Sequence, residues 1–348
     1  MTDVTAVICA YGDQPHLLDV IAALQASTGV GVEIVVVDNG SPQCADLPGG
    51  VVLLQPGCNT GFAGGCNLGA RQASGTTLVF VNSDAVVDPG CLALLHHEAA
   101  DGDVVGATIL IADEPDTVNS WGNPVHVLGF SWAGGYGHPV GEAVGGAVAS
   151  VSGAVFAVRR DVYWRLGGMD DEYFAYGEDV DVSLRAWLSG RRVRVLSAAR
   201  AWHHYDFSRN PAKMYLLERN RLITVLTTYR PRTLLALAPL LVAAEAGLLV
   251  RSREEGWADQ KLAGWRWLAS HRRYLRARRN RLQGTRRAAD AQLLARMTLA
   301  LDPPRRFGMS VPASWQAAID AYWRLVGAPV AGVRQAAPEP RGHVGAGH

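Results

Sequence analysis

The chain has 348 residues, a formal net charge of +1, and 49% apolar against 19% charged residues. This composition excludes global disorder, the length suits one large α/β domain with an appendage, and the balanced charge alone favours neither nucleic acid nor a membrane. The five cysteines form no Cys-x-x-Cys pair, and residues 1–11 lack a basic region followed by an apolar one. We therefore expect no disulfide framework, no zinc site, no signal peptide and a reducing, cytoplasmic location.

The first hundred residues alternate between apolar runs rich in β-branched residues and segments with helical spacing. The runs 4–10, 32–37, 51–54 and 77–81 predict strands, and the segments 17–25 and 64–73 predict helices. Continuous apolar strands separated by helices indicate a mostly parallel, Rossmann-like sheet covered on both faces. Ligands of such sheets bind beyond the carboxyl ends of the strands, where Asp13, Asp38 and Asp84 are expected.

The next part of the chain is less regular until a helix that begins with acids. Residues 119–146 are rich in glycine and contain Trp121 and Trp132, which predicts loops and short strands. Residues 151–159 and 192–196 predict strands, and the segment 179–188 predicts a helix that Gly190 closes. His203 and His204 are expected just after the last of these strands.

After about residue 210 the chain becomes helical and basic. Residues 214–229 predict a helix, 234–250 form an almost wholly apolar segment, and arginines interleaved with tryptophans follow to residue 287. We therefore expect an α/β domain at 1–210, with a first half at about 1–110 and a second half at about 111–210. A helical, basic region at 211–335 and a disordered tail at 336–348 would follow.

Two acids at predicted strand ends have both a chemical and a structural interpretation. In Asn82-Ser83-Asp84, the last carboxylate can hold Mg²⁺ or Mn²⁺ against the phosphates of a nucleotide. Asp38 opens Asp-Asn-Gly-Ser and can hydrogen-bond a base or a ribose. Both acids are also typical of turns and helix caps, and these alternatives stay open from the residues alone.

A glycine-rich loop at 59–67 leads into a predicted helix and contains Gly61, Phe62 and Asn67. Such a loop lets the backbone approach a nucleotide closely, and a helix N-terminus favours phosphate. The loop has neither a Walker A sequence nor a G-x-G-x-x-G fingerprint, so a simple tight connection explains it equally well.

The acidic run 178–181 places three carboxylates within four residues at a helix start. Acids favour a helix N-terminus, and Asp181 can pair with Arg185 one turn later, so we assign Asp181 to structure. Asp179 is our candidate general base for an acceptor hydroxyl, and Glu178 is expected to position the acceptor. A solvated acidic face is the alternative. His203, as a neutral imidazole, can complete a metal shell that begins with Asp84.

The order and spacing of these motifs resemble the family 2 glycosyltransferases, in particular the bacterial branch of rhamnosyl- and galactofuranosyltransferases. The matching stretches within about residues 3–230 are VVVDNGS at 35–41, NTGFAGGCNLG at 59–69, VNSD at 81–84, SGA at 152–154, RR at 159–160, GGMDDEYF at 167–174, Tyr176, EDVD at 178–181, Arg185, Gly190, His203 and RNR at 219–221. One departure is Asn82, where the usual metal motif has an aspartate.

The resemblance implies a GT-A fold, in which 1–210 would be the catalytic domain with a donor half at about 1–110 and an acceptor half at about 111–210. It also implies a nucleotide-sugar donor, a divalent metal (Mg²⁺ or Mn²⁺) and inversion at the anomeric carbon. Asp84 and His203 would hold the metal, and Asp179, assisted by Glu178, would be the base. The expected donor-side residues are Ala10, Tyr11, Asp13, Asp38, Gly61, Phe62, Asn67, Asn82 and Ser83. The expected acceptor-side residues are Trp121, Trp132, Gly153 and Glu178.

The apolar segment 234–250 is at the short limit for a membrane span, and Pro239 and Glu245 interrupt it. The basic, tryptophan-bearing stretch that follows suits an anionic bilayer surface, where polyprenyl-linked acceptors lie. We therefore expect peripheral contact with the inner face of a membrane and no nucleic-acid partner. The alternative is a helical hairpin packed on the catalytic domain with a solvated arginine face.

Two other functions compete with glycosyl transfer. A nucleotidyltransferase of related fold would make the nucleotide sugar, but the segment 10–13 does not resemble the glycine-rich, basic loop that such an enzyme needs. A catalytically degenerate sugar-nucleotide-binding protein is the other alternative. Asn82 favours it, and the intact Glu178-Asp179 pair argues against it.

Overall fold

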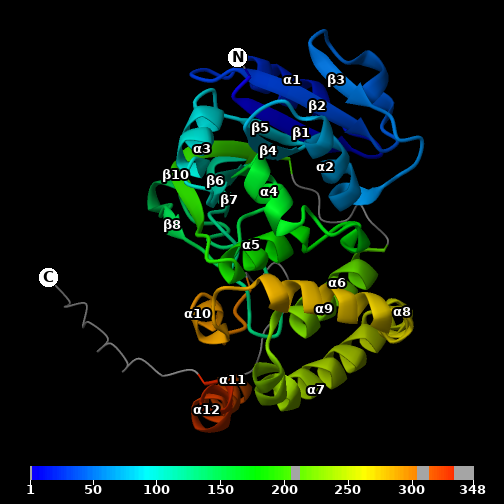
Figure 1. Ribbon diagram of the computed structural model, residues 1–348, viewed down its shortest axis with the longest axis vertical. Helices are drawn as coiled ribbons and strands as arrows, with labels where there is room; N and C mark the ends of the chain where they lie inside the picture. Colours follow the sequence, from blue (N-terminus) through cyan, green and yellow to red (C-terminus); the bar gives the residue numbers. More distant parts are fainter. Residues whose placement is uncertain (1, 205–211, 304–312, 333–348) are drawn as a thin grey trace, which may run out of the picture.

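The computed structural model describes residues 2–204, 212–303 and 313–332. The tail predicted to be disordered, 336–348, and the predicted domain boundary at 210 both lie outside the described residues. Figure 1 shows an α/β portion followed by a helical one, with β1–β3 at one end of the molecule and α7, α11 and α12 at the other.

Four parallel strands form the first half of the central sheet. They are β1 (Val4–Ala10), β2 (Val32–Asp38), β3 (Val51–Leu54) and β4 (Thr77–Asn82), in the order β3-β2-β1-β4. The register pairs Ala10 with Asp38 and Cys9 with Asn82. The predicted strands and their parallel arrangement are confirmed here, and three strand ends that carry candidate residues meet at one edge.

The second half of the sheet is mixed. It contains β5 (Ala85–Val87), β6 (Val104–Ile111), β7 (Glu114–Ser120), β8 (Gly146–Ala147), β9 (Val155–Arg159) and β10 (Val193–His203). Strand β9 lies antiparallel between β4 and β6, whereas β10 is parallel to β6. The prediction that the last strand ends at residue 196 is wrong, because β10 continues after an irregularity between Leu196 and Arg200. His203 therefore lies inside the strand and not after it.

Helices cover both faces of the sheet, each over its own apolar cluster. On one face lie α1 (Leu17–Gln25) and α3 (Cys91–Ala99). On the other lie α2 (Gly61–Gln72), α4 (Arg160–Leu166) and α5 (Glu178–Leu188). Short 3₁₀ turns occur at Pro42–Asp46, Val140–Glu142 and Asp171–Tyr173. Because nearly every side chain of β1 and β4 is buried, the strands read as continuous apolar runs.

The helical portion contains α6 (Lys213–Thr228), α7 (Pro231–Glu254), α8 (Ala258–Ser270), α9 (Arg272–Thr285), α10 (Asp290–Leu294), α11 (Ala313–Tyr322), a π-type turn at Trp323–Gly327 and α12 (Ala328–Ala331). A third apolar cluster joins this portion to the α/β portion, with Leu184 and Leu188 of α5 packed beside Val225 of α6 and Leu237 of α7. The predicted helical appendage is thus confirmed. Among the described helices, α7 alone is long and apolar enough to cross a membrane.

Candidate active site

The carboxyl ends of β1, β2 and β4 bring several predicted donor residues to one edge. Ala10 is buried, Tyr11 is 60% exposed beside it, and Asp38 ends the neighbouring strand. Partial burial opposes the charge of Asp38, but the amides of Ser41 and Gly40 each donate to its Oδ1 at 2.9 Å and leave its pKa lowered. Asp38 is therefore an anion held in a tight turn, which suits an acceptor of donor hydroxyls.

Two glutamines that the sequence analysis did not single out connect these strand ends. Gln14 accepts from the Ser83 hydroxyl at 2.9 Å and donates to the Tyr11 carbonyl at 2.7 Å. The Gln43 side chain donates to Asp13 at 2.6 Å and accepts from the backbone amide of Gln14. Neither glutamine belongs to a motif by spacing, so only the fold reveals that they tie the predicted donor residues together.

The two predicted metal ligands lie next to each other. His203 Nε2 is 3.0 Å from Asp84 Oδ1, and the Asn82 side-chain amide is 3.4 Å from the same imidazole nitrogen. His204 instead stacks on His16, with ring centroids 3.6 Å apart. This geometry favours His203 over His204 as the partner of Asp84.

A carboxylate and an imidazole fit a divalent cation that takes its other ligands from a diphosphate. Within the described ranges, no cluster of three or more His, Cys, Asp and Glu side chains is arranged for a metal ion. Asn82, where the family motif has an acid, is consistent with so small a donor set.

The glycine-rich loop contacts the segment 170–177, which precedes α5 and which we call the acidic loop. Gly61 has φ of +73°, and a side chain there would lie 2.5 Å from the Phe174 carbonyl oxygen, so this position requires glycine. The Ala63 amide donates to the same carbonyl at 3.1 Å. Asn39 donates to the Gly61 carbonyl at 3.0 Å and secures the loop from the other side. Phe62 follows Gly61 and is half-buried.

Asn67 uses both atoms of its side-chain amide within the chain. Its Oδ1 accepts from Tyr163 at 2.6 Å, and its Nδ2 donates to the Met169 carbonyl at 2.8 Å and to Asp171 at 2.6 Å. The residue is 3% exposed. These bonds favour a role in fixing α2 to the acidic loop, and a donor contact by Asn67 stays a prediction.

The predicted base and its neighbour lie at the N-terminus of α5. Asp179 is half-buried, and its Oδ2 accepts from the Gly153 amide at 2.9 Å. Glu178 is 7% exposed, and its Oε2 has no hydrogen-bond partner among the described residues. Burial, and then the charge of Asp179, raise the pKa of Glu178 to about 8, and burial also raises the pKa of Asp179. The pair thus combines a protonated acid with a carboxylate of increased basicity.

Residues 153 and 154 connect this acid pair to the predicted metal side. The Ala154 carbonyl accepts from the backbone amide of Asn82 at 2.8 Å, while the adjacent backbone amide of Gly153 donates to Asp179. The end of β4 and the start of α5 are therefore joined through two consecutive residues.

Asp181 is a structural residue, as predicted. Arg185 donates to its Oδ2 at 2.8 Å, and Arg278 of α9 donates to its Oδ1. Burial opposes the charge of Asp181, but the two arginines leave its pKa lowered. Arg278 is 1% exposed and also lies 3.3 Å from Asp170. The sequence analysis missed Arg278, because the pattern of α9 does not distinguish it from the neighbouring exposed arginines.

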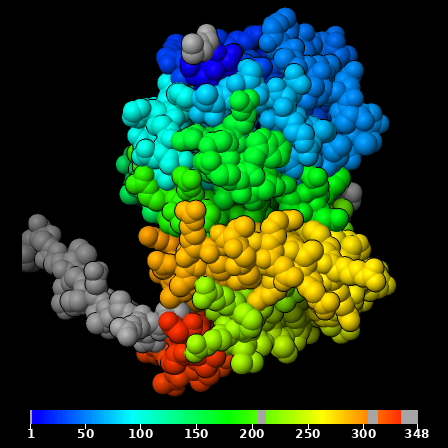
Figure 2. Space-filling view, in the orientation of Figure 1, coloured from blue at the N-terminus to red at the C-terminus, as the bar shows by residue number. Residues whose placement is uncertain are grey.

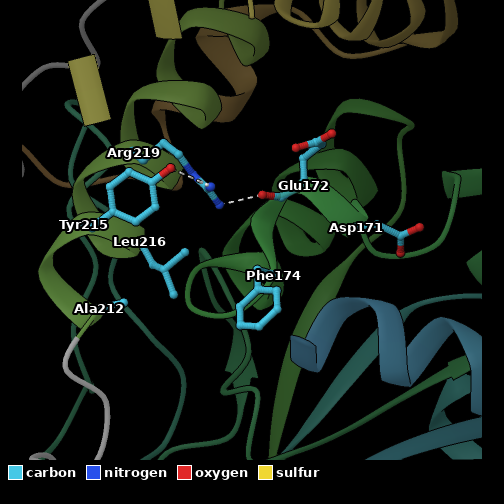
Figure 3. Close-up of a pocket in the computed structure, with 7 residues that line it drawn as sticks. All are labelled: Asp171, Glu172, Phe174, Ala212, Tyr215, Leu216 and Arg219. Atoms are coloured by element: carbon cyan, nitrogen blue, oxygen red, sulfur yellow. Dashed lines mark hydrogen bonds between the residues drawn. The ribbon is translucent and has the colours of Figure 1, made fainter. Parts of the chain in front are cut away.

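Helix α6 holds the loop that leads to the acid pair. The Asn220 side chain donates to the carbonyls of Tyr173, Ala175 and Tyr176 at 2.7–2.9 Å. Figure 3 shows Arg219 between the Tyr215 hydroxyl and the Glu172 carbonyl, at the wall of a cavity. The cavity has a volume of about 370 Å³ and is lined by Asp171, Glu172, Phe174, Ala212, Tyr215, Leu216 and Arg219.

The two predicted acceptor tryptophans lie in the irregular segment after β7. Trp121 packs at the margin of the second apolar cluster, and its ring lies 5.4 Å from that of His138. Gly135 approaches the Trp121 ring so closely that a side chain there would clash. Trp132 is half-buried. The acceptor role of both tryptophans stays a prediction.

Comparison with known proteins identifies the α/β portion. Residues 5–167 match the family model described as glycosyl transferase family 2. The solved structure of GalNAc-T7 with UDP, GalNAc and Mn²⁺ superposes with a TM-score of 0.57 at 15% identity, over 69% of this chain and 51% of that one. At this identity the likeness concerns the fold alone, and it confirms the predicted GT-A architecture.

Two curated bacterial proteins are similar in sequence. The chain is 34% identical over 159 residues to the O-antigen biosynthesis protein RfbC of Myxococcus xanthus. This alignment covers 41% of this chain and 12% of that protein. It is 28% identical over 246 residues to the N-acetylglucosaminyl-diphospho-decaprenol L-rhamnosyltransferase of Mycobacterium tuberculosis. This alignment covers 61% of this chain and 80% of that protein. The matched residues 5–167 and these relatives show that the α/β portion contains a glycosyl transferase family 2 region, which is characteristic of glycosyltransferases.

Proposed function

We propose that this chain transfers a sugar, with rhamnose as the first candidate, from a nucleoside diphosphate to a hydroxyl of a lipid-linked glycan. The observation that carries the proposal is the junction at residues 153 and 154, which connects the backbone amide of Asn82 to the Asp179 carboxylate. This junction brings a site suited to a diphosphate and a carboxylate suited to a base to the same edge of the sheet. The rhamnosyl donor and the decaprenol-linked acceptor are suggested by the mycobacterial relative.

Asp179 is the proposed general base. It is partly accessible, and the Gly153 amide orients its carboxylate while burial raises its pKa. A carboxylate of increased basicity removes the proton from an acceptor hydroxyl as that oxygen attacks the anomeric carbon. One base suffices for direct displacement from the face opposite the leaving group, so we propose inversion. Glu178, protonated near neutral pH, would donate a hydrogen bond to the acceptor.

Asp84 and His203 are the proposed ligands of a divalent metal ion. Their atoms lie 3.0 Å apart at the end of β4, and this acid and imidazole suit Mn²⁺ or Mg²⁺. When bound, the ion would supply positive charge that stabilises the diphosphate leaving group. Asp38 would hold the nucleoside, and Tyr11, exposed at the same edge, is placed to cover it.

The location that we propose follows from the acceptor. A lipid-linked acceptor lies in a bilayer and a nucleotide sugar lies in the cytoplasm, so the reaction would occur at the inner face of the cell membrane. The predicted domain limits, 1–210 and 211–335, stay proposals, since the third apolar cluster packs the two portions together.

The test measures nucleoside diphosphate release from a panel of UDP-, GDP- and dTDP-sugars, with Mn²⁺, Mg²⁺ or EDTA, and with membrane extract as the acceptor source. Metal-dependent release from one donor, increased by extract and lost in Asp179→Asn, is the expected result. Release of pyrophosphate from a sugar phosphate and a nucleoside triphosphate would instead indicate a nucleotidyltransferase.

Two other results would contradict parts of the proposal. Tight donor binding without turnover, even with extract, would indicate a degenerate site. Full activity in EDTA would remove the metal from the mechanism and leave the base in place. Failure to bind any donor would overturn the proposed function as a whole.

A further inference from the structure

One face of α7 is both exposed and apolar over most of the helix. Positions 235, 239, 242, 246 and 250 recur at intervals of three or four residues, are exposed, and carry Leu, Pro, Val, Ala and Val. Leu235, Val242 and Val250 are 70%, 69% and 55% exposed. At a rise of 1.5 Å per residue this stripe is about 22 Å long. We call these five positions the α7 stripe.

An arginine lies at each end of the α7 stripe, on the same face of the helix. Arg232 precedes Leu235 by three positions, Arg253 follows Val250 by three, and both are exposed. The nearby Arg251 is instead engaged with Glu255 at 2.7 Å. The stripe positions themselves carry no acid. An apolar band with cationic ends is complementary to a bilayer with anionic headgroups, because arginine side chains reach the headgroups while the band enters the acyl boundary.

A second helix extends this surface. The Tyr322 hydroxyl of α11 donates to the Ala236 carbonyl at 2.7 Å. A groove of about 330 Å³ between the two helices is lined by Pro239, Leu240, Ser314, Trp315, Ala318, Ile319 and Tyr322. Trp315 is 64% exposed at this groove. Figures 1 and 2 show α7 together with α11 and α12 at the end of the molecule opposite β1–β3. The apolar stripe is thus part of a wider surface at that end.

The flank of α7 beside the stripe is fixed to the protein by charges. Glu245 forms ion pairs with Arg221 of α6 and Lys261 of α8, and Lys261 is fully buried. Trp265 donates to the same carboxylate at 2.6 Å. A helix that crossed the bilayer would have to break these pairs and place Glu245 in hydrocarbon, which is costly. The apolar composition of α7 therefore does not make it a span.

The basic stretch expected to face the bilayer turns partly inward. Lys261 pairs with Glu245, Arg278 with Asp181, and Arg286 with Asp290, all in buried positions. These cations hold helices together and are not available to headgroups. Other arginines of this stretch, among them Arg272, Arg273 and Arg276, are exposed, but the exposed apolar stripe lies on α7. We therefore assign the bilayer contact to α7.

We propose that α7 lies in the plane of an anionic membrane surface, with the α7 stripe in the acyl boundary and Arg232 and Arg253 at the headgroups, and that it does not cross the bilayer. This inference deepens the proposed location at a membrane. It is tested by lipid binding without donor or acceptor, so its failure and that of the proposed sugar transfer are distinguishable.

The experiment is flotation of the purified full chain with vesicles of phosphatidylcholine alone or mixed with phosphatidylglycerol. The wild type is expected to float with the mixed vesicles and to be released in part by high salt. Leu235→Glu/Val242→Glu is expected to weaken binding at least ~10-fold, because two charges would enter the acyl boundary. Arg232→Gln and Arg253→Gln are each expected to weaken it about fivefold, from about 1 kcal/mol for each basic residue near the surface.

The matched control is Val144→Glu, since Val144 is 71% exposed and lies outside α7. It should bind like the wild type, and thermal melting should show every variant folded. Salt release of the wild type needs no variant, so the proposal remains testable if a variant misfolds.

Four results would overturn the proposal. They are no flotation of the wild type, equal flotation of the stripe variant and the control, resistance of membrane-bound protein to alkaline carbonate as for a spanning helix, and a stable dimer that the stripe substitutions dissociate. The last would mean that a second copy of the chain covers the stripe.

Discussion

In the proposed mechanism, Asp179 is the residue on which the chemistry depends most. We predict that Asp179→Asn lowers the transfer rate by about 10²–10⁴, because a positioned base contributes that much and an amide cannot accept the proton. Donor affinity should change little, since the carboxylate is held by the Gly153 amide on the acceptor side. Initial rates and donor titration would measure both. Glu172→Gln, an exposed acid on the preceding loop, is the control, and equal losses in the two variants would contradict the assignment.

Glu178 should reduce stability as the pH rises. Its pKa is about 8 in the folded state, above the ordinary value of 4.5, because burial and Asp179 disfavour the charged form. The folded state then binds more protons than the unfolded state between these pH values, so stability falls as the pH rises through this window. We predict that Glu178→Gln is more stable than the wild type by about 1–3 kcal/mol at pH 8.5, and by much less near pH 4.5.

Urea denaturation of both proteins at the two pH values measures this effect. A pH-independent difference would mean that the Glu178 side chain is solvated and titrates normally. The same variant should keep most of its activity while it gains stability, because the glutamine amide can still donate the proposed hydrogen bond to the acceptor.

Residue pairs that are close in sequence could be predicted, and distant ones could not. The pairing of Asp181 with Arg185 follows from helical spacing and is confirmed. The partner on its other oxygen, Arg278, is 97 residues away. Gln14 and Gln43 likewise act across loops whose approach is set by the sheet. Spacing contains no information about such contacts until the strand order is known.

At the scale of elements, hydrophobic pattern located strands better than it located their ends. Strands β1 and β3 have the predicted bounds, because both are short runs closed by turn residues. Strand β10 exceeds its prediction by seven residues, from 196 to 203. Its second half pairs with β5 and β6 after the irregularity at 197–199, and this irregularity interrupts the alternation that would otherwise extend the predicted strand.

Helix α9 should stabilise α5, the helix that carries the proposed base, through one buried arginine. We predict that Arg278→Met destabilises the fold by about 3–5 kcal/mol, because Asp181 would keep a buried charge with one partner fewer. Urea denaturation measures the change. Arg281→Met is the control, since Arg281 is 62% exposed and lies 3.8 Å from Asp170, and it should cost less than about 0.5 kcal/mol.

The double variant Asp181→Asn/Arg278→Met separates charge from packing. Its loss should be smaller than the sum of the two single losses, since both members of the Asp181–Arg278 pair are removed together and only Arg185 loses its carboxylate partner. Additive losses would mean that Arg278 stabilises α9 without acting on α5.

At the scale of the molecule, the two portions differ in sequence character but share a core. The family match ends at residue 167, and the composition changes near 210. The third apolar cluster nevertheless packs Val125 and Leu184 against Val225 and Leu237. The composition change therefore marks a change in secondary structure, and the packing indicates a single cooperative unit.

This packing predicts the effect of removing the helical portion. A chain that ends at residue 204 would expose the α5 and 125–128 side of the third cluster, and Asn220 would no longer hold the loop before Glu178. We expect it to lose cooperative urea unfolding and to bind a hydrophobic dye, as a partly packed state does. A chain that ends at residue 332 keeps the whole cluster and should unfold like the wild type. Cooperative unfolding of the shorter chain at the wild-type midpoint would instead show that the α/β portion is an independent domain. The helical portion would then not be needed for its stability.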